Sequence, residues 1–184
     1  MPDDLRHYRT GSGRREAPGT RPLSASREDP MAPLRRTLVT GALAGYVASR
    51  TMDAVTGVFH ARQSEDSRKR EDEIAPGGTL VQLGHQLGAV AGRDLDDATA
   101  GRVGLAVHRT FGTTYGVLAA LLARRGLHPV AAGLTVGAAA WAVVDEGTAL
   151  PTMTDYPLVS HARGVVGHTT VGLTIGVLLA LAGD

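Results

Sequence analysis

Four long apolar segments alternate with polar stretches along the chain. They run from about 37 to 58, 105 to 122, 129 to 144 and 164 to 182, so each holds 16 to 22 residues. A helix needs about 20 residues to cross a hydrocarbon core of about 30 Å. A buried soluble bundle can contain helices this short, but four such segments with few polar residues on any face favour membrane spans. The pattern predicts an all-α protein, a four-span transmembrane bundle that occupies residues 35–184.

The polar stretches differ in composition. Residues 1–34 mix Arg, Pro, Gly, Ser and acidic residues without a hydrophobic period, which predicts a disordered tail. Residues 61–103 form a polar linker that begins with ARQSEDSRKREDE, typical of a solvated helical extension of the first span, and APGG then breaks that helix. Within Thr79–Gly92 the residues Leu80, Leu83, Leu87 and Val90 share a helix face. This spacing predicts a short interfacial helix.

Small residues four positions apart occur in every predicted span. They are Gly41, Gly45 and Ser49; Gly112 and Gly116; Gly133 and Gly137; and Gly172 and Gly176. Residues at this spacing share a helix face, and small ones let helix backbones approach closely in lipid. A chain rich in Gly and Ala also produces such spacings by chance. Glycine faces without a partner within the chain would favour a homo-oligomer in the lipid bilayer.

Composition and motifs exclude several functions. The chain has 19 Lys and Arg against 18 Asp and Glu, and this balance argues against a nucleic-acid partner. It has no Cys, which excludes disulfides, thiolate nucleophiles, Cys-ligated zinc and iron–sulfur clusters. The stretch Thr40–Gly45 lacks the next glycine and the preceding strand of a dinucleotide-binding fold. No motif of an enzyme class is present, so the sequence favours a protein that is not an enzyme.

The distribution of basic residues bears on membrane orientation. Arg35 and Arg36 precede the first span, and Arg124 and Arg125 lie in the short hairpin between the second and third spans. All four would lie on one side, which the positive-inside rule makes cytoplasmic. The six basic residues of the linker, on the opposite side, oppose this assignment. The balance favours a cytoplasmic N-terminus.

Ionisable residues gather at one end of the predicted spans. In an up-and-down topology, the end of the first and third spans and the start of the second and fourth share one membrane face. The polar cluster on this face consists of Arg50, Asp53, His108, Arg109, Asp145, Glu146, His161 and His168, with His60 and Arg163 beside it. Charges within hydrocarbon are costly and usually face a bundle interior or a water-filled cavity. The polar cluster is therefore a candidate functional site.

Three interpretations of the polar cluster are compatible with the sequence. Pairing of Arg50 with Asp53, and of Arg109 with Asp145 or Glu146, would make it a structural element. Alternatively, His108, Glu146 and His168 offer two imidazoles and a carboxylate on three helices, which suits a divalent metal or, through the histidines, haem. In the third interpretation, the histidines and carboxylates handle protons or a small solute.

Four short motifs carry a resemblance to a known family. They are GALAGYVASRTMD (41–53), VHRTFGTTYG (107–116), DEGTALP (145–151) and VVGHTTVG (165–172). On these motifs, residues 37–182 resemble the YagU-like family of small bacterial inner-membrane proteins. The resemblance implies a bacterial inner-membrane location and a link to acid-stress survival, with no known catalysed reaction. His108 and His168 match family positions, whereas Glu146 stands where a family member has His.

The expected function is that of a multi-pass inner-membrane protein of stress or acid response, whose polar cluster handles protons or a small solute. Two alternatives stay open: a metal- or haem-binding membrane protein, and a structural or assembly subunit.

Overall fold

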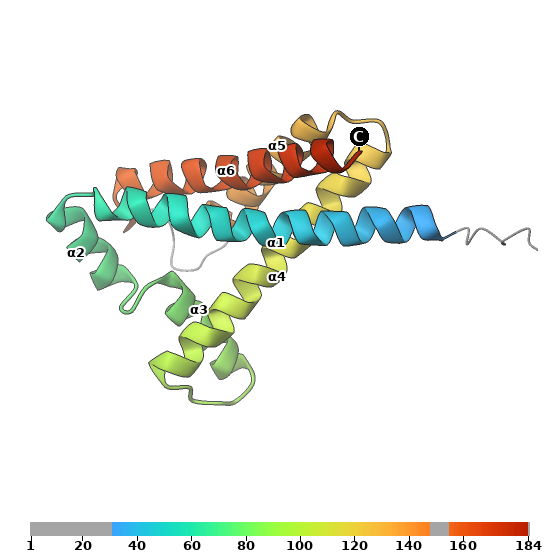
Figure 1. Ribbon diagram of the computed structural model, residues 1–184. Coiled ribbons are helices and arrows are strands. Elements are labelled where there is room, and N and C mark those ends of the chain that lie inside the picture. Colours follow the sequence, from blue (N-terminus) through green and yellow to red (C-terminus); the bar gives the residue numbers. More distant parts are fainter. Residues whose placement is uncertain (1–30, 148–154, 184) are drawn as a thin grey trace, which may run out of the picture. The chain divides into compact units, whose positions relative to one another are not determined.

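The computed structural model describes residues 31–147 and 155–183, and these residues contain helices and turns but no strand. The elements are α1 (Ala32–Ala61), α2 (Glu65–Ile74), α3 (Thr79–Val90), α4 (Asp97–Arg124), α5 (Pro129–Ala140), the π-helix η1 (Trp141–Asp145) and α6 (Leu158–Gly183) (Figure 1). The predicted all-α class is confirmed. The predicted tail falls mostly on residues 1–30, outside the described residues, and α1 begins at Ala32, inside the segment predicted as tail.

The start of the polar linker is a separate helix rather than an extension of α1. After a turn at Arg62 and Gln63, Ser64 caps α2, and its hydroxyl accepts a hydrogen bond of 3.2 Å from the Ser67 amide. The prediction of one continuous helix is wrong because this serine supplies a new N-terminus. The helix break at APGG lies where the sequence predicts it. Gly77 and Gly78 have φ angles of 75° and 92°, a conformation that favours glycine.

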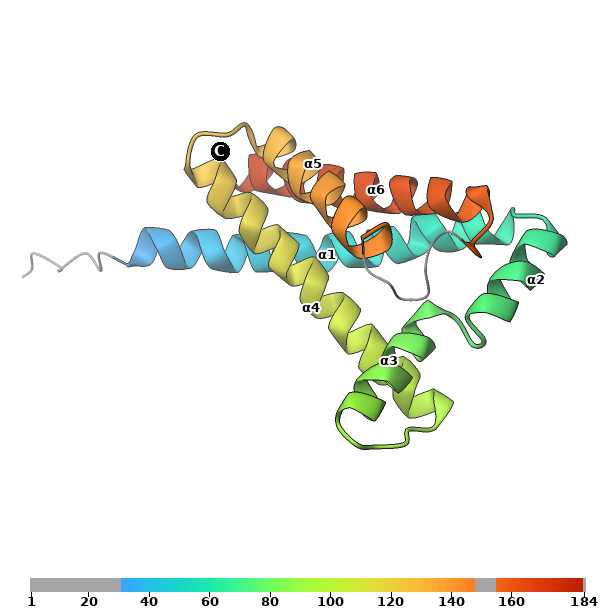
Figure 2. The same ribbon diagram turned by 180° about the vertical axis from the view of Figure 1, so that it is seen from behind.

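The four long helical segments pack as antiparallel neighbours. At one end of the α1–α6 pair, the Arg36 guanidinium donates to the Ala182 carbonyl at 3.0 Å, and at the other end Arg163 donates to Gln63 at 2.7 Å. α1 also packs against α4, and α5 packs against both α4 and α6. Figures 1 and 2 show α6 running beside α1 in both views, with α4 crossing α1. These contacts give the up-and-down order on which the predicted polar cluster depends.

The closest approaches between these helices are made by glycine. A Cβ atom at Gly116 would lie 2.0 Å from the Gly41 carbonyl oxygen, and one at Gly45 would lie 2.1 Å from the Gly112 carbonyl oxygen. In the α5–α6 pair, a Cβ at Gly133 would lie 2.2 Å from the oxygen of Gly172. Because these glycine faces meet inside the chain, they give no reason for a homo-oligomer, which stays a prediction.

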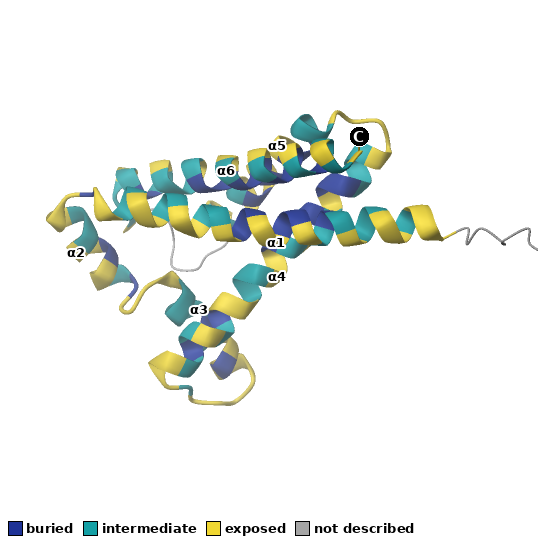
Figure 3. Cartoon of the chain, in the orientation of Figure 1, coloured by how far each residue is buried: buried dark blue, intermediate teal, exposed yellow. Residues whose placement is uncertain are grey.

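Large apolar side chains lie mainly on the outside of these helices. The buried apolar residues are mostly alanines, and the largest fully buried side chains are Ile175 and Ser49. The exposed large side chains include Val39, Leu43, Phe111, Leu118, Leu173 and Val177, and Figure 3 shows exposed positions recurring along α1 and α6. Helices of water-soluble bundles bury their large apolar residues. The described helices show the reverse arrangement, with small residues inside and large ones outside.

One helix of the described residues, α6, is long and apolar enough to cross a membrane, and only 39% of its most apolar stretch is buried. The segment Pro129–Asp145 is a shorter apolar helix. α1 and α4 have 30 and 28 residues but carry charged side chains and many small or weakly polar residues, which lower their hydropathy. The structure therefore supports one candidate span where the sequence predicts four.

α3 begins at Thr79, as predicted, and packs on the first turns of α4 through glycine. A Cβ atom at Gly84 would lie 1.9 Å from the oxygen of Ala100. The predicted apolar face of α3 is partly uncovered, because Leu87 is 38% and Val90 89% exposed. The glycine face, rather than the leucine face, makes the contact with α4, and the interfacial location of α3 stays a prediction.

Alanine at Gly104 is expected to detach α3 from α4, whereas alanine at Gly101 is not. A Cβ at Gly104 would lie 1.9 Å from the oxygen of Leu80, but one at Gly101 would meet only a methyl group of Val81 at 3.5 Å. Replacing a helical glycine with alanine by itself stabilises a helix by about 1 kcal/mol. Hydrogen exchange over residues 79–90 should accelerate in Gly104→Ala alone. Equal protection in both variants would contradict the close contact.

Candidate functional site

An inner cavity of about 90 Å³ lies between α1, α4, η1 and α6. Its histidine and carboxylate lining residues come from three elements: His108 on α4, Asp145 on η1 and His168 on α6. The other lining residues are Ser49, Met52, Phe111, Gly112, Tyr115, Val144 and Val171. At a liquid volume of about 30 Å³ per water, a cavity of this size accommodates roughly three waters. It suits water and protons rather than an organic solute.

His168 is a deeply buried part of this lining. Its side chain is 8% exposed, and its Nε2 lies 3.2 Å from an Asp145 carboxylate oxygen. The other ring nitrogen, Nδ1, is buried and has no hydrogen-bond partner among the described residues. A buried polar nitrogen without a partner is costly, so it commonly meets an ordered water or a ligand. The inner cavity adjoins the His168 side chain.

The π-helix η1 positions Asp145. The Glu146 amide donates to the Trp141 carbonyl at 3.2 Å, the five-residue spacing that defines a π-helix. Gly164 on α6 makes room for the carboxylate, since a Cβ there would lie 2.7 Å from the second Asp145 oxygen. Single π-helical turns are frequent at functional sites. Neither η1 nor the role of Gly164 is visible in the apolar pattern of this segment.

On the other side of the inner cavity, Asp53 of α1 is held by a histidine and an arginine of α4. One carboxylate oxygen lies 3.0 Å from His108 Nε2, and the other accepts a hydrogen bond from the Arg109 guanidinium. Arg109 also donates to the Ser49 hydroxyl at 2.9 Å. The crossing of α1 and α4 at their glycines brings these positions opposite one another.

Two pairings predicted from the sequence are therefore wrong. Arg109 pairs with Asp53 rather than with Asp145 or Glu146, because α4 meets α1 at this level. Asp53 pairs across to α4 rather than with Arg50 on its own helix. Arg50 is exposed and makes no ion pair with any residue that the structure describes.

Glu146 lies apart from the inner cavity and pairs with His161, whose Nδ1 is 2.9 Å from its carboxylate. The predicted metal triad of His108, Glu146 and His168 is therefore not brought together. Within residues 31–147 and 155–183, no group of three His, Asp or Glu side chains could hold a metal ion. A cavity of about 90 Å³ is also far too small for a haem. The donor set and the space fit neither cofactor.

A larger polar pocket, the outer pocket, adjoins Asp53 and has a volume of about 340 Å³. Its ionisable lining residues are Asp53, His60, Glu71, Asp72, Tyr156 and Arg163, and Thr56, Gly57, Ala75, Gly78 and Thr79 complete it. Asp53 lines the outer pocket, whereas its partner His108 lines the inner cavity. The Asp53–His108 pair therefore connects the two spaces.

Glu71 anchors α2 to α1 and α6 at the outer pocket. Its side chain is 8% exposed and accepts hydrogen bonds from Gln63 at 3.0 Å, from Arg163 at 2.8 Å and from the Ser160 hydroxyl. Burial alone would raise the pKa of Glu71, but the hydrogen bonds from Ser160, Arg163 and Gln63 and the charge of Arg163 outweigh it and lower the pKa. Glu71 cannot be recognised in the sequence, because nothing distinguishes it among the acids of a charged helix.

Acid is expected to release α2 from α1 and α6. Because the pKa of Glu71 is below its ordinary value of 4.5 in the folded chain, its anionic form contributes stability that is fully present above that value. This stability is lost as the pH falls through the lowered pKa. Hydrogen exchange over residues 65–74, corrected for intrinsic rates, should accelerate below about pH 4 in the wild type. Glu71→Gln should show weak protection at every pH, and pH-independent protection in the wild type would refute the role of Glu71.

The ionisable groups lie at one end of the long helices, in a row that leads from the outer pocket to the inner cavity. They lead from Glu71 and Arg163 in the outer pocket, through Asp53 and His108, to the inner cavity with His168 and Asp145. Beyond the cavity, residues 37–49, 110–123, 129–140 and 169–183 contain no Asp, Glu, His, Lys or Arg. This half holds the glycine contacts of α1 with α4 and of α5 with α6. The row thus ends at the cavity.

Comparison of the chain with protein-family models, curated proteins and solved structures found no match. The function is therefore inferred from the geometry of the site.

Proposed function

We propose that this chain is a multi-pass protein of the bacterial inner membrane that binds protons in the inner cavity and responds to acid. One observation carries the proposal: His108, His168 and Asp145 line a water-sized cavity, and each histidine is paired with an aspartate, His108 with Asp53 and His168 with Asp145. Imidazole is the side chain that gains or loses charge near neutral pH, and buried His and Asp groups form proton relays in membranes.

The distribution of side-chain sizes supports the membrane location. Helices in lipid associate through small residues, and their large apolar residues can face the acyl chains. The described helices have this arrangement, and α6 has the length and hydropathy of a span. In the proposal α1, α4, Pro129–Asp145 and α6 all cross the bilayer. The resemblance to the YagU-like family adds support for the inner membrane and for a role in acid stress.

Basic residues support the proposed orientation. Arg35 and Arg36 near the start of α1 and Arg124 and Arg125 at the end of α4 lie at the end of the helices away from the polar cluster. The positive-inside rule places this end in the cytoplasm. The outer pocket then faces the periplasm, where external acid arrives first.

The helix segments beyond the inner cavity contain no ionisable residues, which favours proton binding over proton conduction. Conduction across the bilayer needs polar groups or water on both sides of the binding site. Here the cytoplasmic half is closed by helix contacts at glycine, where even a methyl group has no space. The proposed activity is therefore that of a pH sensor. Proteoliposomes of the wild type should leak protons no faster than empty liposomes.

Protonation of His168 is expected to change the packing around the inner cavity. The groups that face it are Asp145 on η1, His108 and Tyr115 on α4, and, through His108, Asp53 on α1. Nitrogen-15 NMR of ring-labelled protein in liposomes detects protonation of the His168 ring directly. Hydrogen exchange of residues 164–172 should change as the ring is protonated.

The control for this experiment is the same substitution at another histidine. His168→Gln should abolish the pH-dependent exchange of residues 164–172, whereas His128→Gln, at the exposed start of α5, should leave it intact. A His168 ring that stays neutral until the protein unfolds would overturn the proposed function.

A further inference from the structure

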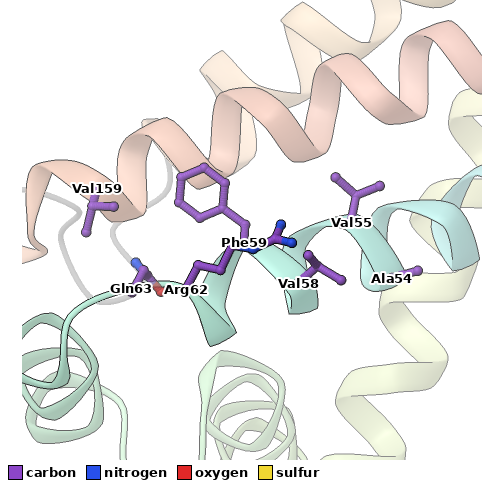
Figure 4. Close-up of a pocket in the computed structure, with 7 residues that line it drawn as sticks. All are labelled: Ala54, Val55, Val58, Phe59, Arg62, Gln63 and Val159. Carbon is purple, nitrogen blue, oxygen red and sulfur yellow. The ribbon is translucent and has the colours of Figure 1, made fainter.

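An apolar groove of about 590 Å³ runs between the end of α1 and the start of α6. Its lining consists of Ala54, Val55, Val58, Phe59, Arg62, Gln63 and Val159. Figure 4 shows the Phe59 ring between the two helices, with Val159 on α6. The volume lies within the range of about 300 to 1,000 Å³ that is typical of ligand pockets. None of the charged residues that line the outer pocket also lines this groove.

One cation lies in this groove. Arg62 follows the last residue of α1, and Figure 4 shows its side chain extending back along α1 beside Phe59 and Val58. Within the described ranges, no carboxylate forms an ion pair or hydrogen bond with Arg62. The neighbouring Gln63, in contrast, bonds to Glu71 and Arg163. Arg62 is exposed, so its guanidinium is accessible to an anion at this groove, and the described residues supply none.

The position of the groove indicates where that anion comes from. α1 ends at Ala61, and the chain then enters the charged sequence of α2, EDSRKREDEI. In the proposed membrane orientation, this change from apolar to charged residues marks the boundary between hydrocarbon and headgroups. A phospholipid places its phosphate at this level and its acyl chains along the apolar part of the helices.

We propose that the groove binds one anionic phospholipid, with the phosphate on the Arg62 guanidinium and an acyl chain along Phe59 and Val159. This inference rests on the proposed membrane location. A lipid here would bridge the end of α1 and the start of α6. Gln63, just after α1, and Ser160 and Arg163 of α6 hold Glu71 and thereby α2. The lipid would stabilise the same arrangement that acid is expected to loosen.

Native mass spectrometry of the full chain, titrated with phosphatidylglycerol and with phosphatidylcholine of the same acyl chains, tests this site. The wild type should retain one phosphatidylglycerol more strongly than phosphatidylcholine. Arg62→Gln should weaken phosphatidylglycerol binding about fivefold, the equivalent of about 1 kcal/mol for one basic residue at an anionic lipid surface. Val159→Trp, which fills the groove and keeps Arg62, should also displace the lipid.

Arg125→Gln is the matched control, because it removes the same charge from an exposed position in the hairpin after α4. Equal losses in Arg62→Gln and Arg125→Gln, or equal binding of the two lipids, would overturn the lipid site. Retention of the wild type in carbonate-washed membranes is measured separately. Retained protein without groove lipid refutes the lipid site alone, whereas release into the wash refutes the membrane location and, with it, the lipid site.

Discussion

Leucine at Gly116 is expected to separate α1 from α4 and to lower the free energy of unfolding by about 3 kcal/mol or more, the upper end of the cost of overpacking. A Cβ at this position would lie 2.0 Å from the Gly41 oxygen and 2.5 Å from the Gly45 nitrogen. Both neighbours are backbone atoms, which cannot rotate away as a side chain would. Unfolding in detergent, followed by circular dichroism, should show the loss directly.

The control is leucine at Gly57, in the same long helix pair but with open space around it. A Cβ at Gly57 would meet no atom within 4 Å. Gly57→Leu is therefore expected to change stability by about 0.5 kcal/mol or less, apart from a gain in helix propensity. If Gly116→Leu were as stable as Gly57→Leu, the glycine contact would not hold α1 and α4 together.

The second large effect is expected at Arg163, which pairs with the buried Glu71. Arg163→Met leaves the Glu71 carboxylate with hydrogen bonds from Gln63 and Ser160 and with the His60 ring 3.4 Å away, but without a guanidinium. Stranding a buried charge in this way should cost about 2 to 3 kcal/mol at neutral pH. The difference from the wild type should shrink as acid protonates Glu71, because a neutral carboxyl no longer needs the guanidinium. Denaturant unfolding at several pH values measures both effects.

An exposed ion pair on α2, the helix that carries Glu71, provides the comparison. Arg70 and Glu73 pair at 3.4 Å with side chains 55% and 53% exposed. Arg70→Met should therefore cost at most about 0.5 kcal/mol. Adding Glu71→Gln to Arg163→Met should recover part of the lost stability, since no stranded charge remains. A loss in Arg163→Met that is independent of pH would show that packing, not charge, is responsible.

Much of the helix arrangement follows from apolar periodicity. The segment from 129 to 144 matches Pro129–Asp145, and the small residues spaced four apart lie at the helix contacts. The other segments extend beyond their apolar part. α4 begins at Asp97 because the Asp96 side chain accepts a hydrogen bond of 2.7 Å from the Thr99 amide, a capping signal present in the sequence.

The candidate site was predicted as a region but not as a set of partners. His108, His168 and Asp145 meet around one cavity, and Asp53 pairs with His108 beside it, as the up-and-down order requires. Which carboxylate each histidine or arginine contacts depends on how the helices are rotated, and one-dimensional patterns do not contain that information. The π-helical turn in η1 adds a further rotation, which directs Asp145 toward His168 and places Glu146 beside His161.

The most direct test of the account uses single cysteines, because the chain has none of its own. Three positions suffice: Thr56 in the outer pocket, Leu43 on the outer face of α1, and Arg125 in the hairpin after α4. Leu43 is 63% exposed. In intact right-side-out vesicles, a membrane-impermeant maleimide should label Thr56→Cys at once and Arg125→Cys only after permeabilisation. Leu43→Cys should stay unlabelled until the protein is denatured. Labelling of Leu43→Cys as fast as Thr56→Cys would show that the outer faces of the helices meet water rather than lipid, and would contradict the account.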